Sequence, residues 1–340
     1  MSESRRDQIP FVYMLSQNNS GSTLLTFLLN RHEDIVSLGE AQRLSSYLRR
    51  RWSPHPEVES MCSSGEPYYD SAFWNKLIAN LTMKGVPMSV TPEYLRQIIF
   101  PYSLRLNYLA TRYPWIHRLY QVAKPLYATR QHEAHRRTKI LAETVMEMLG
   151  AKIYLDSTKN TNYAYNLMQN PYFDFKIINL VRDGRGVLGS QYRKRKDKGR
   201  KTFEALLEQW MRLENSRYGI LQLLGDERYI TTKYEDIATR PLDELHRIAD
   251  FLGVDGDKMR LDFYNTEHYI IGNPMRLRDD DEIKLRVTWQ QDLSPEFIEI
   301  FHERALHHNQ RNGYAPDYVT PAGYEHLAQP ISDQDMTTTG

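Results

Sequence analysis

Cysteine, net charge and long apolar runs are all scarce in this sequence. Its 340 residues include one cysteine, Cys62, so no internal disulfide can form. Lys plus Arg number 44 and Asp plus Glu 43, which leaves almost no global charge to attract nucleic acid or a membrane surface. No run reaches the roughly 18 apolar residues of a membrane span, and the N-terminus MSESRRDQIP lacks the apolar segment of a secretory signal. These absences predict a soluble, cytoplasmic protein without nucleic-acid or membrane partners.

Several signatures of catalytic centres are missing as well. The eleven histidines show no HExxH pattern, and Cys62 has no CxxC partner. The GxSxG sequence of a serine nucleophile elbow is also absent. The sequence therefore predicts no catalytic metal and argues against the commonest class of hydrolase.

Apolar runs of strand length alternate with helical patterns along the chain. The apolar runs are Phe11–Leu15, Ile153–Leu155 and Phe175–Val181, and Tyr229–Thr232 is a further run rich in β-forming residues. Each is followed by residues with helical spacing. This alternation predicts an α/β fold with a parallel sheet flanked by helices.

The chain divides into one core region and two segments of different character. We expect a single domain over residues 8–320, and a polar, flexible tail over 328–340. Residues 43–137 are rich in Tyr, Arg and Pro and predict a mainly helical insertion. We expect the insertion to cover the acceptor site at the strand ends, where open α/β sheets bind ligands; a helical layer that serves stability alone is the alternative.

The first strand-to-helix turn, SQNNSGSTLL, has the outline of a phosphate-binding loop. In the P-loop pattern GxxxxGK[ST], backbone amides hold phosphate while a lysine reaches its outer oxygens; here Ser22 stands at the lysine position. The missing lysine weakens the hypothesis of a kinase or ATPase, because such enzymes need positive charge and Mg²⁺ at the terminal phosphates. A plain turn with a serine N-cap is the simpler alternative. The candidate anion ligands are Asn19, Ser20, Gly21, Ser22 and Thr23.

A second turn, LVRDGRGVLGSQYRKR, also suits a phosphate. Arg182 directly follows a buried strand, where its guanidinium can fork onto a phosphate, and Ser190 lies about two helical turns further on. The basic run over residues 193–201, seven basic residues in nine, raises the local anion concentration or forms a solvated helix end. Two such turns in one sheet predict a ligand with phosphates at two places.

Together these motifs resemble the sulfotransferase superfamily that uses 3′-phosphoadenosine-5′-phosphosulfate (PAPS). The first turn resembles its 5′-phosphosulfate loop, and Leu180–Val187 with Ser190 resembles its 3′-phosphate motif. LGE, DSTKN, KYEDIATRP and HYIIGNPMR follow in the family's order, so the resemblance spans about residues 11 to 314. It implies a P-loop-NTPase-like sulfotransferase fold of the branch with a GE motif after the first helix.

The resemblance also implies an activity. The expected reaction transfers a sulfuryl group from PAPS to a hydroxyl or amine of a small metabolite, natural product or carbohydrate, with PAP as product. Two alternatives remain: a P-loop-type nucleotide kinase or hydrolase, and a catalytically silent PAP-binding protein on the same fold. Persistence of Glu40, Lys159, Arg182 and Ser190 together favours the enzyme.

Roles for single residues follow from the resemblance. Glu40 of the GE motif is the expected base, with His32 as its rival and helix capping as its simpler role. The family usually has a basic residue where this chain has Asn19, so we expect Lys159 to supply the cation, unless it only pairs with Asp156. Two arginines have expected roles in binding: Arg43, which orients the carboxylate or an acidic acceptor, and Arg276, which contacts the 3′-phosphate end of the donor.

Overall fold

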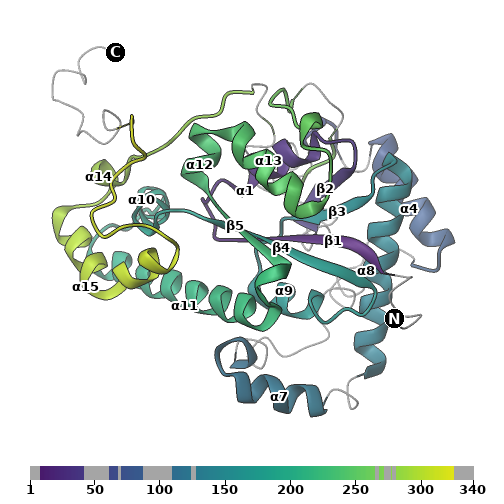
Figure 1. The fold of residues 1–340 in the computed structure, drawn as a ribbon, viewed down its shortest axis with the longest axis horizontal. Coiled ribbons are helices and arrows are strands. Elements are labelled where there is room, and N and C mark those ends of the chain that lie inside the picture. Colours follow the sequence, from purple (N-terminus) through teal and green to yellow (C-terminus); the bar gives the residue numbers. More distant parts are fainter. Residues whose placement is uncertain are drawn as a thin grey trace.

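We describe the protein from a computed structural model, over residues 8–41, 61–67, 70–86, 109–123, 128–264, 268–271, 277 and 281–324. Five parallel strands form one central sheet in the order β2-β3-β1-β4-β5 (Figure 1). The strands are β1 (Ile9–Ser16), β2 (Ile35–Gly39), β3 (Ile153–Asp156), β4 (Phe173–Val181) and β5 (Tyr229–Lys233). The predicted parallel α/β sheet is confirmed, and β2 is a strand that the sequence pattern did not reveal.

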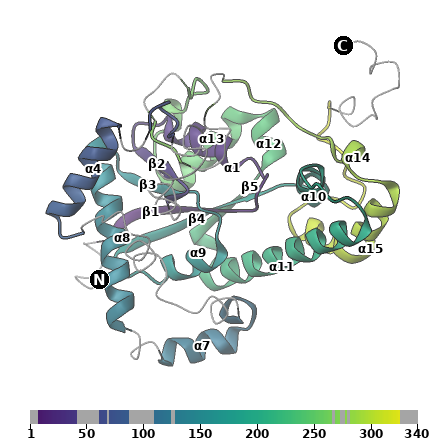
Figure 2. The same ribbon diagram turned by 180° about the vertical axis from the view of Figure 1, so that it is seen from behind.

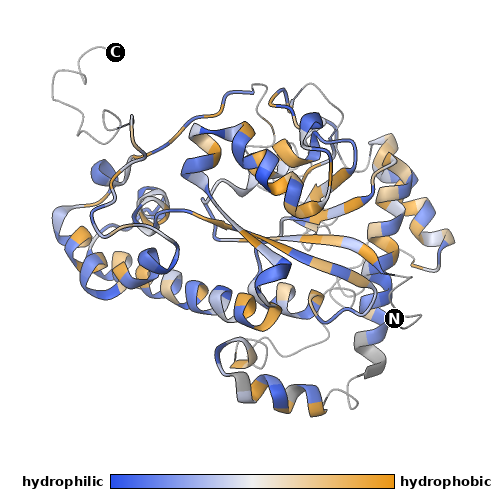
Figure 3. Cartoon of the chain, in the orientation of Figure 1, coloured by the Kyte–Doolittle hydropathy of each residue, from blue (hydrophilic) through white to orange (hydrophobic). Residues whose placement is uncertain are grey.

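The inner strands β3, β1 and β4 are mostly buried, which agrees with their largely apolar sequences, whereas the edge strand β5 (YITTK) is only partly buried. Side chains alternate along β1, so Phe11, Tyr13 and Leu15 enter one core cluster while Val12 and Met14 enter another. Hydropathy drawn on the ribbon shows apolar residues along the strands and polar residues on the outer sides of the helices (Figure 3).

Helices cover the two faces in separate layers (Figures 1 and 2). One layer contains α1 (Ser22–Asn30), α12 (Tyr234–Thr239) and α13 (Pro241–Leu252). The other contains α4 (Ala72–Met83), α8 (Ala128–Leu149), α9 (Thr161–Leu167) and α11 (Arg200–Leu224). A further group lies beyond the strand ends, with α10 (Gly184–Arg193), α14 (Trp289–Asp292) and α15 (Pro295–Arg311). Short helices η5 (Asp226–Arg228) and η6 (Gly256–Lys258) and the helix α7 (Pro114–Ala123) complete the described elements.

Two helices, α13 and α15, begin and end with residues typical of those positions. Pro241 occupies the first turn of α13, and Gly253 ends it in the left-handed conformation, with φ 77°. Ser294 caps α15, because its hydroxyl accepts a hydrogen bond from the backbone N–H of Phe297. Apolar faces of both helices are buried, so local signals and packing agree.

The described part of the predicted insertion is mainly helical, apart from residues 61–67, where Met61 and Pro67 form an antiparallel bridge. α4 packs on α8, which runs along the sheet and leads into β3. α7 contacts α9, where His117 Nδ1 lies 2.7 Å from the Tyr165 hydroxyl. Residues 43–60, 68–69, 87–108 and 124–127 of the insertion, and the tail 328–340, lie outside the described residues. No helix in the described part of the chain is long and apolar enough to cross a membrane.

Candidate active site at the carboxyl edge of the sheet

The loop after β1 leads into α1 without a side-chain cap on the helix. α1 begins at Ser22 without a side-chain cap, so its first backbone N–H groups point out of the helix end. Ser20 and Ser22 are buried, at 1% and 4% exposure, beside these amides. Gly21 has φ 83°, and a Cβ on it would lie 2.5 Å from the Tyr234 ring. Only glycine therefore allows this close turn.

Arg182 lies directly against this loop. Ser16 of β1 pairs with Leu180 of β4, which brings the ends of the two strands together. The Arg182 guanidinium donates to the backbone carbonyls of Asn19 (2.7 Å) and Arg286 (2.6 Å). It also lies 4.4 Å from the centre of the Tyr234 ring. The two turns that the sequence proposed as phosphate sites thus form one surface.

Ser190 lies on the same face of α10 as Gly186, the residue that packs against Arg182. Gly186 of α10 packs against Arg182, because a Cβ on Gly186 would lie 3.1 Å from the arginine Nε. Ser190 is one turn further along the same helix and is buried, at 8% exposure. The two polar groups of the second motif therefore face the same side.

Glu40 and Lys159 form a buried ion pair at the ends of β2 and β3. Lys159 Nζ lies 2.8 Å from Glu40 Oε1, and the side chains are only 9% and 6% exposed. Gly39 aligns with Asp156 in the β2–β3 register, and Ser157 donates its backbone N–H to the Gly39 carbonyl at 3.0 Å. The partner of Lys159 is therefore the expected base rather than Asp156.

Two residues of the candidate site, Asn19 and Lys159, have an unusual backbone conformation. Among the described residues, Asn19 and Lys159 are the non-glycine residues with positive φ, both at 66°. Such conformations are uncommon and cluster at functional sites, because the surrounding structure must stabilise them. Asn19 lies in the loop after β1, and Lys159 lies in the ion pair.

Asp156 lies beneath the ion pair in a tyrosine-lined interior. Burial, with a contribution from the Glu40 charge, raises the pKa of Asp156 to about 7, although Thr158 donates hydrogen bonds to its Oδ1. Burial and the Asp156 charge raise the pKa of Tyr13 well above its ordinary value. The Tyr13 hydroxyl accepts from the backbone N–H of Asn160 and donates to its carbonyl. The turn carrying Lys159 is thereby fixed to β1.

His32 lies at the opposite end of β2 from Glu40. It precedes Ile35, whereas Glu40 follows Gly39, so the five-residue strand, about 17 Å long, separates them. His32 Nδ1 accepts from the Asp34 N–H (3.1 Å), and its Nε2 lies 2.9 Å from the Asp255 carbonyl. The structure does not bring His32 together with the other candidates. Arg43 and Arg276 lie outside the described residues.

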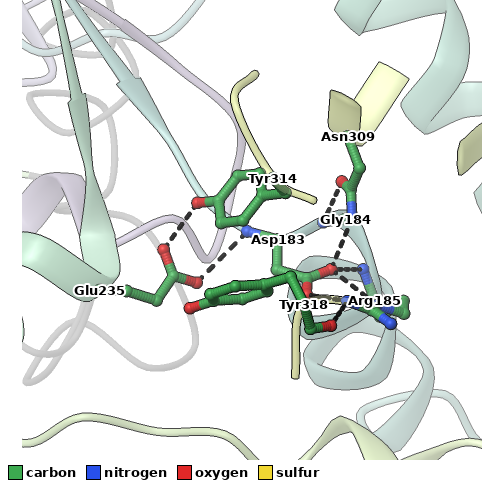
Figure 4. A network of polar contacts seen from close by, with 7 residues as sticks. All are labelled: Asp183, Gly184, Arg185, Glu235, Asn309, Tyr314 and Tyr318. Carbon is green, nitrogen blue, oxygen red and sulfur yellow. Dashed lines mark hydrogen bonds and ion pairs between the residues drawn. The ribbon is translucent and has the colours of Figure 1, made fainter. Parts of the chain in front are cut away.

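A polar network that the sequence analysis assigned no role fixes the ends of β4 and β5 (Figure 4). Asp183 caps α10 and accepts from the Arg185 guanidinium and from Asn309 Nδ2 (2.9 Å). Glu235 accepts from the Tyr314 hydroxyl (2.6 Å) and the Asp183 N–H (3.3 Å). Burial, with the Asp183 charge, raises the pKa of Glu235 to about 7. The network fixes the turn that begins with Arg182. RDGRG, KYEDI and NGY contain Asp183, Glu235 and Tyr314, but nothing in the spacing of these motifs shows that the three residues meet.

Within the described residues, no group of three His, Cys, Asp or Glu side chains is placed to hold a metal ion. The polar groups at the carboxyl edge of the sheet are instead suited to binding an anion and to transferring a proton. Hydrogen-bond donors come from the loop and Arg182, and a carboxylate comes from Glu40 beside the Lys159 ammonium.

Comparison with known proteins identifies the class. The sequence profile described as the sulfotransferase family matches residues 10–258, so this chain belongs to the sulfotransferase family. Its five-stranded parallel sheet with flanking helices is the P-loop-like sulfotransferase fold. No curated protein matches the sequence.

Solved structures that resemble this chain include sulfotransferase domains. The domain from the Synechococcus PCC 7002 olefin synthase is 21% identical, with 87% of this chain and 95% of that chain covered and a TM-score of 0.46. The domain from the curacin biosynthetic pathway is 16% identical, with coverages of 87% and 98% and a TM-score of 0.49. Retinol dehydratase, solved with androsterone and the inactive cofactor PAP, is 12% identical, with coverages of 93% and 84% and a TM-score of 0.39.

Proposed function

We propose that this sulfotransferase transfers a sulfuryl group from PAPS to a hydroxyl or amine of a small-molecule or carbohydrate acceptor. The observation that carries the proposal is the direct contact between the two anion-binding turns, in which Arg182 donates to the carbonyl of Asn19 at 2.7 Å. A ligand with two separated phosphate groups fits such a joined surface.

The donor groups available at this surface fit the two ends of PAPS. The open N-terminus of α1, with Ser20, Ser22 and Thr23, would hold the 5′-phosphosulfate. Arg182 uses two of its five N–H donors on backbone carbonyls, so three remain for the 3′-phosphate, with Ser190 on the same side. Arg276, the last residue of GNPMR, is assigned to the same phosphate on the sequence resemblance.

Glu40 is the proposed general base. The acceptor oxygen or nitrogen attacks the sulfur, and the bond between sulfur and the bridging oxygen of the 5′-phosphate breaks. The electron pair of that bond stays on the phosphate of PAP, and the acceptor proton moves to the Glu40 carboxylate. Because His32 lies at the other end of β2, we assign it no role in this step.

Lys159 has two proposed tasks. Its contact with Glu40, at 2.8 Å, orients the carboxylate. A lysine ammonium has three N–H donors, so two remain for oxygens of the sulfuryl group as negative charge shifts during transfer. Arg43, three residues after Glu40, is the proposed contact for an acidic group of the acceptor.

Two measurements test the proposed function. Incubation with ³⁵S-labelled PAPS and a mixed pool of hydroxyl and amine acceptors should transfer label to an acceptor. PAP should raise the melting temperature, whereas ATP with Mg²⁺ should not, because the loop lacks the P-loop lysine. Stabilisation by PAP without any transfer would indicate the silent binder, and stabilisation by ATP with Mg²⁺ alone would indicate the kinase.

A further inference from the structure

The basic run after α10 is largely engaged in structural contacts. Arg193 pairs with Asp292 at 2.6 Å. Lys198 donates to the carbonyl of Arg193 at 3.0 Å, and Arg200 pairs with Glu296 at 3.1 Å. These three basic side chains hold helix ends and the connection between α10 and α11. They do not gather into a shared anion site.

Lys194 differs from these three residues, because it contacts Asn19 in the loop after β1. Its Nζ lies 2.9 Å from Oδ1 of Asn19. Lys194 is the C-cap of α10, the helix that starts just after Arg182, so both ends of this helix reach the same loop residue. A pocket of about 250 Å³ between the loop, α10 and α11 is lined by Asn19, Lys194 and Gln191, among others.

This contact fixes which way the Asn19 amide points. A lysine ammonium only donates hydrogen bonds, so the side-chain carbonyl of Asn19 must face Lys194 and its NH₂ group must face away. The backbone of Asn19 is fixed too, by the Arg182 hydrogen bond and by its left-handed conformation. A cation on the carbonyl oxygen polarises the amide, which makes its N–H groups stronger donors.

We propose that Lys194 supplies, through Asn19, the positive charge that the loop itself lacks. The inference rests on the proposed sulfuryl transfer. As the sulfur–oxygen bond breaks, its electron pair stays on the bridging oxygen of the 5′-phosphate, and the polarised Asn19 amide donates a hydrogen bond to that oxygen. Lys194 is thus a positioning residue that acts on the reaction through Asn19, while Lys159 acts beside Glu40.

Reciprocal substitution tests this role. We expect Lys194→Met to lower the rate of labelled-sulfate transfer at saturating PAPS by about tenfold to a hundredfold, less than for a buried donor because Lys194 is exposed and solvent screens its charge. Adding Asn19→Lys to Lys194→Met should restore most of the rate, because the charge then stands in the loop itself. Lys196→Met, in the same exposed run, is the matched control and should stay within about twofold of wild type.

Each outcome decides the inference. A Lys194→Met rate equal to that of Lys196→Met would overturn it, and so would a loss that Asn19→Lys fails to restore while circular dichroism shows a folded protein. Raised ionic strength should slow wild type more than the Asn19→Lys, Lys194→Met double variant, because an exposed charge is screened more strongly. If the wild-type protein transfers no label, the proposed function is wrong and this inference is wrong with it. If the wild-type protein is active and Lys194→Met is equally active, only this inference is wrong.

Discussion

Replacing Gly21 with alanine should damage both the fold and the anion site. The left-handed backbone, at φ 83°, costs a non-glycine residue about 1–2 kcal/mol. The added Cβ would lie 2.5 Å from Cδ2 of Tyr234, and overpacking of this kind costs about 1–3 kcal/mol more. Tyr234 cannot turn away freely, because its hydroxyl donates to the Lys284 carbonyl at 2.8 Å and its ring lies under Arg182. We therefore expect the free energy of unfolding to fall by about 2–5 kcal/mol.

Gly253→Ala is the matched control for Gly21→Ala. Gly253 has a similar φ of 77°, but no heavy atom lies within 4 Å of its added Cβ. It should cost only the backbone strain of about 1–2 kcal/mol and leave PAP affinity unchanged. Gly21→Ala should weaken PAP binding at least about tenfold, because the loop must shift. Urea unfolding and calorimetric titration with PAP measure both quantities. Equal effects of the two variants on stability and on PAP affinity would refute the reasoning.

Three further predictions concern the charged groups of the site. Glu40→Gln should lower the transfer rate by about 10²–10⁴ while PAP still binds; an unchanged rate would remove Glu40 as base. Arg182→Lys keeps the charge but loses the planar fork and the stacking on Tyr234, so calorimetry should show PAP affinity reduced by at least about tenfold, and equal affinity would contradict this. The raised pKa of Asp156, from 3.8 to about 7, favours the neutral form in the fold, so its stabilising contribution is full below pH 3.8 and is lost as pH rises through 7. Asp156→Asn should remove the part of this loss that falls between pH 5 and pH 8, about 3 kcal/mol in urea unfolding, because only the interval from pH 5 to about 7 contributes; the same pH dependence in both proteins would contradict the assignment.

Local patterns predict much of this fold because parallel strands in a buried sheet are continuously apolar. The strands β1, β3 and β4 follow from apolar runs, β5 follows from a run rich in β-forming residues, and the two ends of α13 follow from Pro and Gly signals. β2 escaped prediction because its five residues, IVSLG, are short and contain serine and glycine. The order of the strands depends on long-range pairing, which no local pattern encodes.

Sequence motifs predict the candidate site residues, but they do not predict which of these residues contact each other. Glu40 and Lys159 lie 119 positions apart in the sequence, so only the β2–β3 register brings them to 2.8 Å. The same holds for Lys194, which the sequence shows only as one member of a basic run. The signal that could have singled it out is Asn19 itself, because a loop without a cation predicts a compensating charge nearby.

The account's central claim is that the turns after β1 and β4 together bind a doubly phosphorylated donor. A crystal structure with PAP tests it most directly. We predict the 5′-phosphate on the amides of Ser20–Thr23 at the start of α1, and the 3′-phosphate within hydrogen-bonding distance of Arg182 and Ser190. PAP bound elsewhere on the protein, with both of these positions empty, would contradict the claim.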